Sequence, residues 1–198
     1  MVKFRIFLTL LVSILLLASG CTSQKSDSSS SQNHSKNTLP SIPKNVFSSS
    51  KKNQNISQTE MKKSIIQYLN INNALAKNAN ELASDTDLNK KKQKKLNELF
   101  NKIDENDNNF NKYIRENNIP NNLQKVANKS NNYTISTNEF LRKIHNEVKQ
   151  VNDNQKSVDH INRIEALNEQ YKDKVNGKEQ QELEKLLNKH NIKTKAFK

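Results

Sequence analysis

Residues 88–120 read LNKKKQKKLNELFNKIDENDNNFNKYIRENNIP, and the apolar residues of this stretch decide the fold class. Most of them recur at spacings of three, four and seven residues, which places them on one face of a helix. These residues are Leu88, Leu96, Leu99, Phe100, Ile103, Phe110, Tyr113 and Ile114. Most other positions are Asn, Lys or Glu, so the stretch predicts a long amphipathic helix with a narrow apolar stripe.

Both ends of this helix point to further helices beside it. At Asn118-Ile119-Pro120, asparagine tolerates the left-handed conformation that ends many helices, and proline suits the start of the next one. Upstream, Ser57-Gln58-Thr59-Glu60 fits a capping box, in which the Ser57 oxygen and the Glu60 carboxylate satisfy free amide donors. An apolar stripe follows this box, and we expect its helix to end near residue 84.

Three more apolar runs follow, at residues 123–151, 158–175 and 183–187. The heptad phase continues across residues 152–154, so residues 121–176 form either one long bent helix or two helices. The chain has only two glycines, and no alternating β-branched run stands out apart from residues 133–137. The sequence therefore predicts an all-α fold, in which residues 57–198 form an elongated antiparallel helical bundle with coiled-coil packing.

Residues 21–56 differ in composition from this bundle. They are rich in Ser, Asn, Gln and Lys, and large apolar residues such as Leu39, Ile42 and Phe47 are few. A segment of this kind cannot bury enough surface to offset its chain entropy, so we expect a disordered tether. The alternative is that residues 39–47 form a short docking motif.

Residues 1–20 contain the parts of a lipoprotein signal peptide. Lys3 and Arg5 form a positive region, residues 6–17 are mostly apolar, and small residues precede Cys21, which is the only cysteine. Because these residues resemble a lipobox, we expect cleavage before Cys21 and a diacylglycerol with acyl chains such as palmitate on its thiol. This predicts a lipid anchor on the extracytoplasmic face of the cell membrane. The alternative is an ordinary signal peptide followed by a chance cysteine.

Asn106, Asp107 and Phe110 share one face in the middle of the quoted stretch. We expect Phe110 to be a core residue. Asn106 and Asp107 would flank it and bond to a neighbouring helix, as a buried asparagine fixes register in coiled coils. The alternative is a small polar recognition patch.

Asn106-Asp107-Asn108-Asn109-Phe110, together with the lipobox, the serine-rich segment and the Asn/Lys-rich helices, resembles the NDxxF motif lipoproteins known from staphylococci. Residues 161–171 and 183–197 are also similar to the YkyA-type helical lipoproteins, which are proposed to bind the cell wall. These resemblances imply a location and a helical shape, and they imply no established reaction.

The sequence shows no catalytic or metal-binding constellation. The histidines, which are His34, His145, His160 and His190, are widely spaced, and no second cysteine joins them. Gly20 and Gly177 are too far apart to form a phosphate-binding loop. We therefore predict that the chain is not an enzyme and carries no cofactor or metal ion.

The net charge of +13 points to anionic partners. Its densest source is the run of lysines at residues 90–95. For an exported protein, these partners would be cell-wall polymers or lipid headgroups, and nucleic acid is not expected. The alternative is that abundant Lys and Asn reflect an AT-rich genome and nothing more.

The preferred interpretation is a non-enzymatic, membrane-anchored lipoprotein that presents a basic helical rod to the cell envelope. Its partner would be a wall polymer, an anionic lipid or an envelope protein. One alternative is a ligand-binding lipoprotein that serves a transporter, and another is a modulator of an envelope enzyme.

Overall fold

In the computed structural model, the described residues are 41–85, 89–153 and 157–197. They form helices α2 (Gln58–Ala83), α3 (Lys90–Glu116), α4 (Asn121–Asp153), α5 (Ser157–Tyr171) and α6 (Gly177–Lys189). Within these ranges there is no strand, and one isolated bridge joins Asn55 to Asn118. The predicted all-α fold is confirmed. The signal peptide and Cys21 lie outside the described residues.

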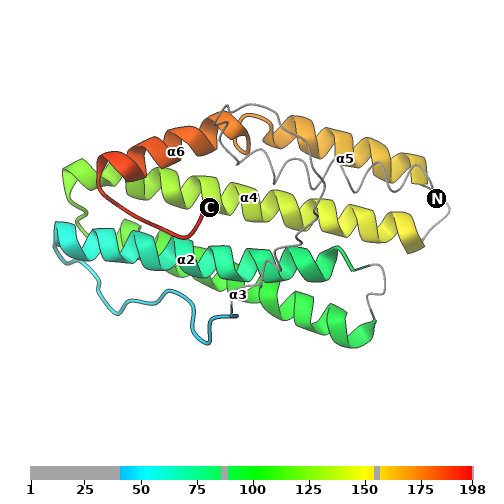
Figure 1. Ribbon diagram of the computed structural model, residues 1–198, viewed down its shortest axis with the longest axis horizontal. Helices are drawn as coiled ribbons and strands as arrows, with labels where there is room; N and C mark the ends of the chain where they lie inside the picture. The colour runs from blue at the N-terminus through cyan, green and yellow to red at the C-terminus, as the bar shows by residue number, and fades with distance from the viewer. Residues whose placement is uncertain (1–40, 86–88, 154–156, 198) are drawn as a thin grey trace, which may run out of the picture.

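The helices form an elongated antiparallel bundle (Figure 1). α2, α3 and α4 pack against one another, and α4 also contacts α5 and α6. α5 and α6 follow one another along the side of α4 that faces away from α2 and α3 (Figure 1). α4 is therefore the central element of the fold.

Residues 121–176 form two helices and not one. α5 folds back on α4 because both helices contribute large apolar side chains to a common cluster, in which Phe140 and Ile144 meet Ile164 and Tyr171. An extended single helix would leave these side chains exposed to water. The continuous heptad phase therefore marks two faces that pack on each other.

Two of the expected helix ends differ from their predictions. The Ser57 oxygen accepts the Glu60 amide N–H at 3.2 Å, as predicted. The Glu60 carboxylate instead accepts from Lys51 Nζ at 2.6 Å and from the Tyr113 hydroxyl at 3.1 Å, so the capping box is only half formed. Asn118 is not left-handed, because its backbone pairs with the segment before α2.

The conformation predicted for Asn118 occurs instead at another asparagine, at the end of α6. Asn191 has a φ of 54°, and the Ile192 amide donates to the Leu187 carbonyl at 2.9 Å. This is a Schellman motif, in which the residue after the asparagine folds back on the last turn. Ile192 is buried there, as the motif favours.

The disordered tether predicted for residues 21–56 is wrong for the part that the structure describes. Residues 42–56, which we call the strap, lie along α2 and α3 (Figure 1). Phe47 is 2% exposed and Ile56 is 4% exposed. A low apolar content did not prevent order here, because the few apolar side chains of the strap are buried between α2 and α3. Leu39 lies outside the described residues, and the alternative of a docking motif at residues 39–47 stays a prediction.

No helix among the described residues is long and apolar enough to cross a membrane.

Candidate functional site

Phe110 lies at the centre of the main core. Its side chain is fully buried. The ring stacks on Tyr68 of α2 with a centroid distance of 4.1 Å, and it meets Phe47 of the strap edge-on at 5.2 Å. One α3 side chain therefore contacts both the neighbouring helix and the strap.

Asp107 connects three helices through hydrogen bonds. Its Oδ1 accepts from the Tyr68 hydroxyl at 2.8 Å, and its Oδ2 accepts from Asn138 Nδ2 of α4 at 2.8 Å. The same Asn138 amide group donates to Asn72 Oδ1 of α2 at 2.8 Å. The network sets the register of α2, α3 and α4, because every member has one partner on another helix.

The Asp107 carboxylate is buried among uncharged donors. Burial raises its pKa from 3.8 to about 6, although the bonds from Asn138 and Tyr68 act in the opposite direction. The pKa of Tyr68 is also raised, first by burial and then by the charge of Asp107. Burial therefore disfavours the charged form of the carboxylate, so the stability of the fold depends on whether Asp107 is protonated.

Asn106 binds the strap and α2. Its Oδ1 accepts the Phe47 amide N–H at 3.0 Å, and its Nδ2 donates to the Tyr68 carbonyl at 3.4 Å. Asn109 donates to the Phe47 carbonyl at 2.9 Å, so the backbone of Phe47 is held on both sides. Of the three predicted motif residues, Asn106 and Phe110 thus contact the strap, and Asp107 bonds to α2 and α4.

Sequence reasoning missed two further residues that hold the strap, one within α3 and one at its C-cap. Asn117 accepts the Gln54 amide N–H at 3.0 Å and donates to the Lys51 carbonyl at 3.0 Å. Lys102 donates to the carbonyls of Pro43 and Lys44 at 3.1 and 3.0 Å. The available sequence signal was a row of polar side chains beside the apolar stripe. This row indicates a binding partner only when the position of the strap is known.

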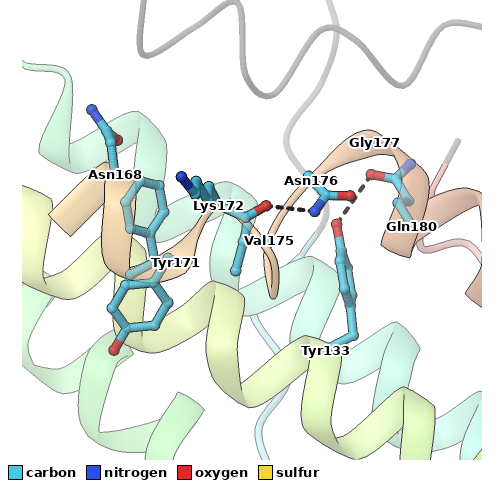
Figure 2. A pocket seen from close by; sticks show the side chains of 9 residues that line it. Tyr133, Asn168, Tyr171, Lys172, Val175, Asn176, Gly177 and Gln180 are labelled. Atoms are coloured by element: carbon cyan, nitrogen blue, oxygen red, sulfur yellow. Dashed lines mark hydrogen bonds between the residues drawn. The ribbon is translucent and has the colours of Figure 1, made fainter. Parts of the chain in front are cut away.

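A second candidate site is the cleft where α5 ends and α6 begins, with a volume of about 310 Å³ (Figure 2). Its walls include Tyr133, Phe140, Tyr171 and Val175. The Tyr133 hydroxyl donates to Gln180 Oε1 at 3.3 Å, and the Tyr171 hydroxyl donates to Glu139 Oε2 at 3.0 Å. The lining Lys172 is paired with Glu169 at 2.6 Å, so these polar groups of the cleft are engaged with neighbouring side chains.

Two histidines of the described ranges, His160 and His145, have separate surroundings. His160 is buried, and its Nδ1 lies 2.8 Å from Glu147 Oε2, which also accepts from Arg163. His145 packs beside Phe100, and burial lowers its pKa. No group of three or more His, Cys, Asp or Glu side chains that could hold a metal ion occurs in the described part of the chain.

The start of α3 is the most concentrated positive surface. Lys90, Lys91, Lys94 and Lys95 are exposed and form no ion pair with a described residue, and we call these four lysines the basic start of α3. Lys92 differs, because its Nζ lies 2.6 Å from Asp85 Oδ2. The first turn of α3 contains no acidic residue.

These features define the chain as an elongated helical bundle with a docked N-terminal strap, a buried polar network and one basic helix start. No known protein family, curated protein or solved structure matches the chain. The resemblance to NDxxF motif lipoproteins therefore stays a prediction.

Proposed function

We propose that the protein is an exported, lipid-anchored and non-enzymatic component of the cell envelope that presents its basic helical bundle to anionic partners. The basic start of α3 is the observation that carries this proposal. Lysines at a helix start oppose the helix dipole, and pairs such as Lys90 and Lys94 repel each other one turn apart. These unfavourable charge interactions lower the stability of the isolated bundle. Binding of an anionic partner to the lysines would offset them, which explains why the lysines are there.

The three partners consistent with this surface are a wall polymer, an anionic lipid and an acidic envelope protein. A transporter-linked ligand-binding role would have to use the cleft at the α5–α6 junction. That role has weaker support, because the tyrosine hydroxyls at the cleft are engaged with neighbouring side chains. The modulation of an envelope enzyme has no specific contact surface in its favour.

Sedimentation of the mature chain, with Cys21→Ala so that no acyl chain can insert, with isolated wall polymer and with anionic vesicles tests the proposal. We expect binding to at least one of them at low salt, with a steep loss as salt rises, because screening shortens the range of charge interactions to about 8 Å at physiological ionic strength. Binding that does not change with salt, or no binding to either at low salt, would contradict the electrostatic function.

The predicted anchor is tested by Cys21→Ala. We expect a high-salt wash to release this variant from the membrane fraction, because it lacks acyl chains that contribute about 0.8 kcal/mol per buried methylene, and salt screens any remaining charge attraction. Fractionation of cells followed by immunoblotting measures this. Ser48→Ala, at an exposed strap position, is the control and should stay with the membrane. A Cys21→Ala protein that remains in the membrane fraction after the wash would refute the anchor.

A further inference from the structure

We infer that the basic start of α3 is the membrane-facing surface of the bundle and that it docks onto anionic lipid headgroups of the anchoring membrane. This inference rests on the proposed function, because it needs the lipid anchor at Cys21. Its new content is the choice of one surface and one partner among those that the proposed function leaves open.

The strap and part of the basic start lie on the same side of α3. Lys91, Lys95 and Lys102 are four and seven residues apart, so their side chains project from one side of the helix. Lys102 is the residue that binds the strap carbonyls of Pro43 and Lys44. The strap therefore continues the line of Lys91 and Lys95 along the helix.

The strap also runs toward the basic start when it is followed back to its first residues. Asn55 pairs with Asn118 beyond the end of α3, Phe47 meets Asn106 near the middle, and Pro43 meets Lys102 (Figure 1). Strap residues that are closer to Cys21 in the sequence thus contact α3 residues that are closer to the start of that helix. The chain leaves the described bundle on the side that carries the lysines.

The length of chain before the strap keeps this surface close to the membrane. Nineteen residues lie between Cys21 and Ser41, the first described residue. A flexible chain of that length has a root-mean-square reach of about 25 Å. Lys95 and Lys90 lie only about 10 and 18 Å along α3 from Lys102, at 1.5 Å per residue. The length of the chain therefore places the lysines within reach of the membrane that would hold Cys21.

The chemistry of the surface fits adsorption to headgroups. At 3.6 residues per turn, the four lysines lie within about 140° of one another around the exposed helix start. Among the described residues, no large exposed apolar side chain accompanies them there. Such a surface attracts phosphate groups by charge. A lysine close to an anionic membrane strengthens binding about fivefold, so four act strongly together.

The test compares two charge-matched variants of the mature chain, both carrying Cys21→Ala so that only the protein surface can bind. In one variant Lys90, Lys91, Lys94 and Lys95 are replaced by Gln. In the control variant the exposed Lys185, Lys189, Lys193 and Lys195 are replaced by Gln, which removes the same charge at the far end of the bundle. Sedimentation with phosphatidylcholine–phosphatidylglycerol vesicles is measured, with pure phosphatidylcholine vesicles and isolated wall polymer as further arms.

We expect the α3 variant to lose vesicle binding on the order of a hundredfold and the control only a few-fold. Thermal melting should show the α3 variant to be at least as stable as the parent, which excludes unfolding as the cause. Equal losses in both variants would overturn the inference and leave the proposed function standing. Binding to wall polymer without binding to anionic vesicles would also overturn only the inference. Binding to neither would remove both.

A fluorophore attached to a cysteine that is introduced on the surface gives an independent measurement of how the bundle is oriented on the membrane. Asn97→Cys lies beside the basic start of α3, and Asn188→Cys lies near the end of α6; both positions are exposed. With Cys21 replaced, each introduced cysteine is the only thiol. We expect headgroup-attached quenchers to reduce emission more strongly at position 97 than at position 188 on anionic vesicles. The reverse order would contradict the inferred orientation.

Discussion

Replacement of Phe110 by Ala is expected to lower the free energy of unfolding by about 3–5 kcal/mol. The ring is fully buried and touches both Tyr68 and Phe47. Its removal leaves a cavity at a point where two helices and the strap meet, and the surrounding side chains can collapse only partly. For a chain of this size, the melting temperature should fall by roughly 10 °C.

Chemical denaturation of the parent and the variant measures this loss. Phe100→Ala is the matched control, because Phe100 lies in the same helix but is only partly buried and contacts Arg142 and His145 at the rim. We expect a clearly smaller loss for the control. Equal losses, or a loss below about 1 kcal/mol for Phe110→Ala, would show that the motif phenylalanine is not a core anchor.

The stability of the protein is expected to depend on the protonation of Asp107. Its pKa is raised from 3.8 to about 6 by burial, so between these values the folded chain keeps a proton that the unfolded chain releases. The stabilisation is fully present below pH 3.8 and is lost as the pH rises through about 6. At about 1.4 kcal/mol per pKa unit, the loss amounts to about 3 kcal/mol.

The variant Asp107→Asn isolates this contribution. The free energy of unfolding of the parent minus that of the variant should fall by about 3 kcal/mol between pH 3.8 and pH 7. The comparison is needed because Glu60 and Glu147, whose pKa values are lowered by their hydrogen-bonded partners, act in the opposite direction in acid.

Parallel pH profiles for the parent and Asp107→Asn would contradict the buried-carboxylate account. The same variant also separates the two interpretations of the motif. If Asp107 serves the fold, its replacement changes melting. If the motif is a recognition patch, partner binding should be lost while melting stays the same.

The sequence predicted the helices well because helical periodicity is a local signal. Ser57 marks the start of α2 and Asn191 marks the end of α6, and both act through neighbours within a few residues. The packing of α5 back onto α4 could not be predicted in this way. The apolar positions keep one phase across residues 152–154, and only the mutual burial of side chains such as Phe140 and Ile164 decides that the chain folds back.

The strap was not predicted because its stability is non-local. Phe47 is an isolated apolar residue in a polar segment, and its burial depends on a groove that α2 and α3 form only after they pack. The bonds that hold its backbone come from Asn106 and Asn109, about sixty residues further along the chain. Average composition contains no information on such partners.

The sequence predicted which motif residues share a face of α3, but it did not predict their partners on other helices. Helical spacing places Asn106, Asp107 and Phe110 on one face, as the structure has them. Their partners, Tyr68 and Asn138, lie on α2 and α4, and nothing in the spacing of α3 identifies them. The raised pKa of Asp107 follows from that three-helix environment, so it too requires the structure.

The central proposal is an envelope protein held by lipid at Cys21. The most direct test is the mass of the N-terminal peptide of the protein purified from membranes. We predict a chain that begins at Cys21 and carries a thioether-linked diacylglycerol with its acyl chains. A chain that retains Met1, or an unmodified Cys21 thiol on the membrane-associated protein, would contradict the proposal.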